Sequence, residues 1–243
     1  QTMARIDGRE NDQLRPVEIL PGINRFAEGS CLIRCGNTHV LCTASVEERT
    51  PPHVPEGEGW VTAEYSMLPR ANRERSRRDI SKGKLSPRSA EIQRLVGRAL
   101  RAAVDLKKLG ARTITIDCDV LQGDGGTRTA SVTGGFVALS YACWKLVEEG
   151  VIPEMPITTC VAAVSAGIVD DVPMLDLCYE EDSSAMVDLN CVMNHEGEII
   201  ELQGTGEGRA FTIAEQRQLV DLCAKGIREI QAIQKAVLEG GDA

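Results

Sequence analysis

The sequence predicts a mixed α/β protein (α+β) in which helices pack on mostly antiparallel β-sheets. Alternating apolar and polar residues in the first third indicate strands, and two long segments with apolar residues every three or four positions indicate helices. After residue 158 the order of strands followed by a helix begins again, so the layout is a duplicated βα order. We expect an N-terminal part at residues 3–150 and a C-terminal part at 151–240, with the seam at 150–158.

The N-terminal part begins with strands. We expect them at residues 26–34, 39–46 and 60–67, with a turn at 36–38 and a loop rich in proline and glycine at 51–59. Ser86 followed by Pro87 is typical of a helix start, and the apolar spacing predicts a helix to about residue 110. A strand at 113–121, a glycine-rich turn and a second helix at about 129–149 follow.

The C-terminal part is predicted to contain strands at 159–169, 174–179, 186–193 and 198–202, with a hairpin turn at 194–197. Thr212 and Glu215 have the spacing of a capping box, in which each side chain accepts a hydrogen bond from the other residue's backbone N–H. They predict a final helix that runs to about residue 238.

The composition favours a cytoplasmic globular protein. Of the 243 residues 42% are hydrophobic and 26% are charged, no apolar run approaches the ~20 residues of a membrane span, and the first residues lack a signal-peptide pattern. The nine cysteines include no Cys-x-x-Cys pair, so we expect reduced thiols packed as small apolar groups. With three histidines and no His-Glu-x-x-His, a zinc hydrolase is also disfavoured.

The charge is distributed very unevenly. The net charge is −9, yet residues 70–88 hold eight basic and two acidic residues and carry +6. This asymmetry predicts a local surface that binds a polyanion, although a solvated loop whose arginines pair with acids in an oligomer explains it equally well. Aromatic residues make up 3% of the chain, so contacts to phosphates are favoured over base stacking.

Residues 123–128, Gly-Asp-Gly-Gly-Thr-Arg, follow a predicted strand and open a helix. Glycines let a backbone approach a ligand closely, and the exposed amides and dipole of a helix start favour an anion. Thr127 adds a hydroxyl donor and Arg128 a bidentate one. Because Gly-Lys-Ser/Thr is absent, this is no Walker loop, and a capped glycine turn without a ligand is the alternative.

Three further charged residues are candidates for a site. Arg88 lies at a predicted helix start, where a cation is unfavourable unless it faces a bound anion or remains solvated. Asp182 and Asp188 are six residues apart, which places both on one face if the segment is extended. Such a pair can hold Mg²⁺ or supply a general acid, but acidic loops are common in a chain of this charge.

These features, in this order, resemble the ribonuclease PH family of bacterial phosphate-dependent exoribonucleases that trim tRNA 3′ ends. The resemblance runs from about residue 8 to 238. The segments that carry it include Asn-Asp-Gln-Leu-Arg-Pro at 11–16, Gly-Trp-Val-Thr-Ala-Glu-Tyr at 59–65, Met-Leu-Pro-Arg at 67–70, Glu-Ile-Gln-Arg-Leu at 91–95, Asp-Cys-Asp-Val-Leu-Gln at 117–122, Gly-Gly-Thr-Arg-Thr-Ala-Ser at 125–131 and Gln-Gly-Thr at 203–205.

The resemblance implies a fold like the second domain of ribosomal protein S5, and a ring of six identical subunits built as a trimer of dimers. It implies that inorganic phosphate is the co-substrate and is bound by Arg88, Gly126, Thr127 and Arg128. Asp182 and Asp188 fall on the family's catalytic acidic pair, with Mg²⁺ as the expected metal. The RNA-binding residues that it implies are Arg70, Arg75 and Arg78, in a loop that contacts tRNA.

The resemblance thus predicts a reversible nucleotidyl transfer in which phosphate attacks the last phosphodiester of a tRNA precursor and a nucleoside diphosphate leaves. Two alternatives stay open at this point. One is a ring subunit that binds RNA without catalysis, and the other is a nuclease that uses water and two metal ions.

Overall fold

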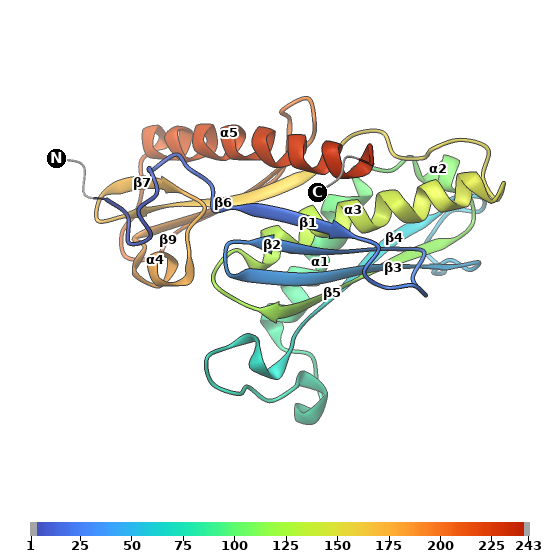
Figure 1. The fold of residues 1–243 in the computed structure, drawn as a ribbon, viewed down its shortest axis with the longest axis horizontal. Coiled ribbons are helices and arrows are strands. Elements are labelled where there is room, and N and C mark those ends of the chain that lie inside the picture. Colours follow the sequence, from blue (N-terminus) through green and yellow to red (C-terminus); the bar gives the residue numbers. More distant parts are fainter. Residues whose placement is uncertain (1–3, 241–243) are drawn as a thin grey trace.

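The computed structural model describes residues 4–240, and Met3, the first residue of the predicted N-terminal part, lies outside this range. The chain forms two sheets that share a long helix between them (Figure 1). Mixed α/β architecture with helices packed on sheets is therefore confirmed.

The first sheet has the strand order β1-β2-β3-β5-β4. Its strands are β1 (Val17–Pro21), β2 (Gly29–Cys35), β3 (Thr38–Glu47), β4 (Trp60–Met67) and β5 (Thr113–Gln122). Neighbours pair in antiparallel fashion except β4 and β5, which are parallel because α1 (Pro87–Arg101) and the short α2 (Leu106–Leu109) connect them. The sequence predicted neither β1 nor a parallel pair.

The second sheet is antiparallel and has the order β7-β6-β8-β9. Its strands are β6 (Ala162–Val169), β7 (Val172–Leu175), β8 (Val187–Met193) and β9 (Ile199–Gly206). The predicted strand at 174–179 is largely wrong, since β7 ends at Leu175 and a helical turn, α4 (Tyr179–Ser184), follows. The turn at 194–197 is confirmed by hydrogen bonds between Asn194 and Glu198.

The helix α3 (Thr127–Glu148) packs against β2 and β3 on one side and β6 on the other. It is long and apolar enough to cross a membrane by length and composition, a property that the sequence analysis did not predict, but 78% of its apolar stretch is buried inside the protein. The apolar side chains of this helix therefore contribute to the core beneath both sheets. The last helix, α5 (Ile213–Leu238), covers the second sheet and passes close to β1 (Figure 1).

The predicted helix boundaries are correct where a cap defines them. Ser86 accepts a hydrogen bond from the Ser89 N–H, and Thr212 and Glu215 form the predicted capping box. The predicted continuation of the first helix to residue 110 is wrong. It ends at Arg101 because residues 103–105 hydrogen-bond with residues 156–158, and Asp105 then caps α2.

Candidate active site

One cavity of about 310 Å³ opens where the two sheets meet. Its wall is built from the start of α1, the glycine turn before α3, the segment that leads into α4, and strands β6 and β8. Six of the residues singled out in the sequence lie in this wall: Arg88, Gly126, Thr127, Arg128, Asp182 and Asp188. The fold thus brings together the predicted anion-binding residues and the predicted acidic pair.

The glycine turn ends at Gly126, which caps α3 in the left-handed region at φ 71°, so the helix begins at Thr127 rather than at the predicted 129. Gly125 has φ 76°, and a Cβ there would lie 2.6 Å from the Leu177 carbonyl oxygen. Only glycine tolerates both that φ and that approach. The close contact sets the C-terminal part directly against the turn, with the first amides of α3 beside the cavity.

Arg128 is held in place at the cavity wall. Its Nη1 donates to both carboxylate oxygens of Glu91 at 3.1 Å and to Gln203 Oε1 at 3.4 Å. Glu91 belongs to α1 and lies one turn after Arg88. A guanidinium has five N–H donors, so this anchoring leaves donors available for an anion in the cavity.

Two contacts connect strand β4 to the same wall. The Tyr65 hydroxyl lies 2.8 Å from Thr127 Oγ1, and both side chains are buried. Two residues further along the strand, Met67 Sδ lies 3.6 Å from Nη1 of the exposed Arg88.

Asp182 and Asp188 lie in the same cavity, but not because they lie on one face of a strand. Asp182 is in the helical turn α4, whereas Asp188 is the second residue of β8, so the argument that both lie on one strand face is wrong. Burial and the neighbouring Asp182 raise the pKa of Asp188 to about 6, against the lowering effect of Arg128. Burial also raises the pKa of Asp182, opposed by Arg128 and Arg88. Asp188 can therefore carry a proton close to neutral pH.

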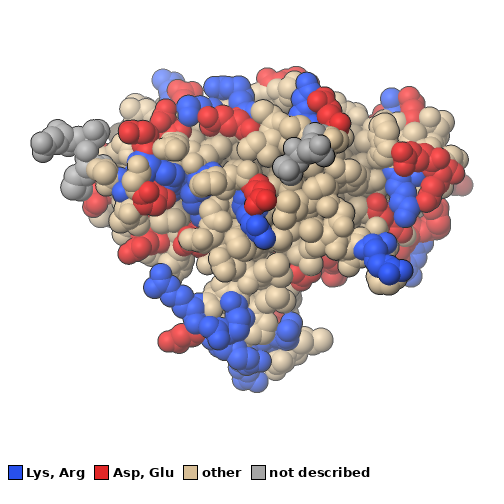
Figure 2. Space-filling model, in the orientation of Figure 1, with Lys and Arg blue, Asp and Glu red and all other residues tan. Residues whose placement is uncertain are grey.

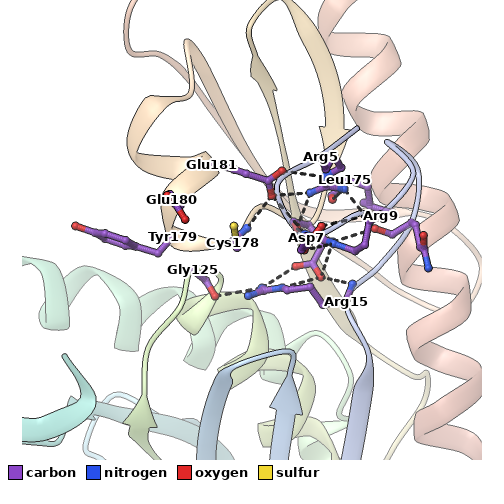
Figure 3. A network of polar contacts seen from close by, with 12 residues as sticks. Arg5, Asp7, Arg9, Arg15, Gly125, Leu175, Cys178, Tyr179, Glu180 and Glu181 are labelled. Carbon is purple, nitrogen blue, oxygen red and sulfur yellow. Dashed lines mark hydrogen bonds and ion pairs between the residues drawn. The ribbon is translucent and has the colours of Figure 1, made fainter. Parts of the chain in front are cut away.

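A buried polar network attaches the N-terminal segment to α4 (Figure 3). The Arg5 guanidinium donates to both carboxylate oxygens of Glu181, from Nε at 2.8 Å and from Nη2 at 2.7 Å. Arg9 adds a bond to Glu181 at 3.3 Å and another to the Asp176 carbonyl oxygen at 2.9 Å. Since Glu181 precedes Asp182, these two arginines fix the helical turn that carries the acid.

The second part of the network joins the two halves of the cavity (Figure 3). Arg15 Nη2 donates to Asp176 Oδ1 at 2.8 Å, and its Nε donates to Oδ2 at 3.1 Å. The same guanidinium donates to the carbonyl oxygens of Asp124 at 2.6 Å and Gly125 at 3.2 Å. Arg15 therefore connects the glycine turn to the segment that leads into α4.

The predicted RNA-binding arginines lie outside the cavity. Arg70, Arg75 and Arg78 are exposed on the segment between β4 and α1, which contains the short helices η1 (Pro69–Ala71) and η2 (Asp79–Lys82). This segment projects from the body of the protein, and lysine and arginine side chains gather on it (Figures 1 and 2). Arg70, at its base, lines a second hollow with Asn72 and Gly123, which also line the cavity.

Comparison with known proteins decides the family. Residues 13–144 match the model of domain 1 of the 3′ exoribonuclease family, and residues 159–225 match that of domain 2. The chain is 54% identical over 237 residues to Ribonuclease PH of Syntrophomonas wolfei, covering 97% of this chain and 99% of that protein. It is 57% identical over 235 residues to Ribonuclease PH of Bacillus pumilus, covering 96% of this chain and 97% of that protein.

The chain belongs to the ribonuclease PH family. The predictions of a phosphate-dependent 3′–5′ exoribonuclease of the nucleotidyltransferase type and of a role in tRNA processing are thereby confirmed.

Solved structures agree with this fold. Rice (Oryza sativa) Rrp46 superposes with a TM-score of 0.79 at 17% identity, covering 96% of this chain and all of that one. A chain of an archaeal exosome core superposes with a TM-score of 0.77 at 25% identity, covering 96% of this chain and 91% of that one. The ribonuclease PH fold, with its two sheets and packed helices, is therefore present here.

Sequence reasoning missed the residues that hold this cavity together. Tyr65, Glu91, Arg15 and Asp176 belong to no local motif, because each acts through a partner far away in the chain. Glu181 bonds the distant Arg5 and also accepts from the nearby Cys178 N–H. The resemblance did include segments that contain Arg15, Tyr65 and Glu91, but it assigned them no role. Within residues 4–240, no group of three or more His, Cys, Asp or Glu side chains is arranged to hold a metal ion.

A second acidic cluster lies on the first sheet, outside the cavity. Glu64 on β4 is opposite Asp117 on the parallel strand β5, and Asp119 lies two residues further. Burial, Glu64 and Asp119 together raise the pKa of Asp117 to about 6. A carboxyl whose pKa is higher in the folded state than in the unfolded state favours folding less as pH rises from about 4 to 6.

We therefore expect Asp117→Asn to raise the melting temperature of this protein at pH 8 and to leave it nearly unchanged near pH 4.5. Because the carboxyl is half-buried and partly screened, the gain at pH 8 is about 1 kcal/mol, or about 2–4 °C. Thermal unfolding at both pH values measures it, and the exposed Glu56→Gln controls for the removal of one negative charge. A gain of equal size at both pH values contradicts the prediction.

Proposed function

We propose that inorganic phosphate binds in the cavity between Arg88 and the start of α3 and attacks the terminal phosphodiester of a tRNA 3′ extension. The observation that carries this proposal is that one cavity is lined by two arginines, a helix N-terminus and an acidic pair. Arg88 and Arg128 supply the positive charge, while the Gly126–Arg128 backbone and the Thr127 hydroxyl supply neutral donors. Together they hold the nucleophile in line with the scissile bond.

In this proposal Asp188 acts on the leaving group. Its raised pKa, about 6, lets it hold a proton that passes to the 3′ oxygen of the shortened RNA. The bond from phosphorus to that oxygen breaks as the bond to the incoming phosphate oxygen forms, so a nucleoside diphosphate leaves and the transfer is reversible. Asp182 adds negative charge beside Asp188 and thereby contributes to that raised pKa.

Mg²⁺ is the alternative to a proton on the same pair, because a bound ion requires ionised carboxylates. The ion prefers oxygen ligands and keeps several waters when one or two carboxylates bind it. Asp182 and Asp188 would hold the ion, with Asn190 as a neighbouring amide in the same cavity. Bound there, Mg²⁺ would neutralise charge on the reacting phosphate oxygens.

We propose further that Arg70, Arg75 and Arg78 bind the tRNA body, since they lie on the projecting basic segment rather than in the cavity. The similarity to a chain of an archaeal exosome core supports a ring, here a homohexamer built as a trimer of dimers. Within one subunit, residues 3–150 and 151–240 would form one catalytic unit. The nine free cysteines fit a reducing cytoplasmic setting.

Product analysis of a 3′-extended tRNA, with and without inorganic phosphate, tests this function. We expect nucleoside diphosphates that appear only with phosphate, and no diphosphate from Asp188→Asn even though this variant still binds the RNA. Nucleoside monophosphates in the absence of phosphate would identify a hydrolytic nuclease. RNA binding without any product would identify a non-catalytic ring subunit.

Arg128→Ala should raise the KM for phosphate about 10-fold to 100-fold, because a charge-assisted hydrogen bond contributes about 1.5–3 kcal/mol. Arg88→Ala should act in the same direction. Steady-state rates at varied phosphate and saturating RNA measure both variants, and Arg94→Ala, on an exposed position of α1, is the matched control. A wild-type phosphate dependence would remove the substituted arginine from this role.

The proposed role of the basic segment predicts a change in how tRNA affinity depends on salt concentration. Each of Arg70→Ala, Arg75→Ala and Arg78→Ala should make the plot of log K against log salt for tRNA shallower, by somewhat less than about one unit for each RNA phosphate that the arginine neutralises. A short oligonucleotide should be affected less than a tRNA, because it cannot span the distance from the cavity to the loop. Equal effects on both RNAs would contradict binding of the tRNA body.

A further inference from the structure

The Tyr65 hydroxyl has no role in packing. Its strand, β4, alternates with Val61, Ala63 and Tyr65 facing the core, and the tyrosine is 2% exposed. A phenylalanine would fill the same space, so apolar burial explains the ring but not the oxygen. A buried phenol needs a hydrogen-bond partner, and among residues 4–240 the only partner of this one is Thr127 Oγ1, at 2.8 Å.

The surroundings determine which of the two hydroxyls donates. Each hydroxyl has one proton and two lone pairs. Among residues 4–240 the Tyr65 hydroxyl is bonded only to Thr127, and Thr127, unlike Tyr65, lines the phosphate cavity. A buried donor without a partner costs more than a shared lone pair. Tyr65 is therefore the donor, and the Thr127 proton is free to point into the cavity.

The position of Thr127 strengthens this assignment. In the body of a helix, a threonine hydroxyl often donates to a backbone carbonyl one turn earlier. Thr127 is the first residue of α3, so the residues one turn earlier belong to the glycine turn, where the Asp124 carbonyl already accepts from Arg15. The hydrogen bond with Tyr65 therefore holds the Thr127 hydroxyl oxygen at the start of the helix.

We propose that Tyr65 is a positioning residue for phosphate: by donating to Thr127 Oγ1 it aims the threonine proton at the anion. This inference rests on the phosphate pocket of the proposed function and adds a residue that never touches the ligand. The donation also polarises the threonine O–H, which strengthens it as a donor. A donor that already points at the ligand does not have to break another hydrogen bond and reorient when phosphate binds.

The test is Tyr65→Phe, which removes one oxygen atom and leaves the ring. We expect the KM for phosphate to rise about five-fold to ten-fold, with kcat at saturating phosphate and the KM for RNA both within about two-fold of wild type. Titration calorimetry with inorganic phosphate should show the same decrease in affinity without turnover. Tyr141→Phe, which removes a hydroxyl that donates to the Val237 carbonyl oxygen at 3.0 Å, is the matched control and should change neither value.

A double-mutant cycle separates positioning from folding. If Tyr65 acts through the threonine hydroxyl, Tyr65→Phe should add nothing to the decrease in phosphate affinity caused by Thr127→Val. Effects that multiply would overturn the proposal. So would an unchanged phosphate KM in Tyr65→Phe, or equal changes in kcat and both KM values. Should Tyr65→Phe fail to fold, Thr127→Ser keeps the oxygen that accepts from Tyr65. It should lose less phosphate affinity than Thr127→Val, and equal decreases in the two variants would overturn the proposal.

Arg128→Ala, assayed together with these variants, distinguishes a failure of the proposed phosphate pocket from a failure of the proposed role of Tyr65. If it raises the phosphate KM while Tyr65→Phe does not, the pocket stands and the role of Tyr65 falls. If neither variant alters the phosphate dependence, the pocket itself is wrong, and the inference about Tyr65 is overturned with it.

Discussion

The buried ion pair between Arg15 and Asp176 is the contact on which the site depends most. Both side chains are less than 10% exposed, and the guanidinium satisfies both carboxylate oxygens as well as two carbonyls of the glycine turn. A buried charge pair is stable only when its remaining donors and acceptors are also satisfied, and here they are. Lysine has no planar fork and could not make these bonds at once.

This ion pair holds together the two segments, one from each sheet's half of the chain, that form the wall of the cavity. Asp176 lies in the left-handed region at φ 56°, a conformation that costs energy for a residue with a side chain. The bonds from Arg15 and the contacts of Arg5 and Arg9 with Glu181 compensate for that strain. The N-terminal segment thus sets the distance between the start of α3 and the helical turn that carries Asp182.

The cavity also places arginine and aspartate side chains close to one another. Arg128 is shared between Glu91 and the cavity, and it lowers the pKa of Asp188 that burial and Asp182 raise. Positive groups that would hold an anion thus lie beside the acidic groups that would act on a leaving oxygen, and the arginines limit the rise in the pKa of the two acids. Arg88 takes part in this balance of charge, whereas the basic residues at 70–84 lie on the projecting segment outside the cavity.

Features that depend on neighbours in the chain could be predicted from local patterns of residues. The periodic strand at 60–67, the caps Ser86 and Thr212, and the glycine turn at 123–128 all carry local signals strong enough to predict their conformation. Contacts between distant segments fix the remaining features. The turn α4 consists of Tyr179 followed by five polar residues with no periodic pattern, and Glu181 is held there by Arg5 and by the Cys178 N–H. Asp182 therefore comes close to Asp188 through packing rather than strand parity, and Tyr65 contacts Thr127 only because the fold brings the end of β4 to the first residue of α3.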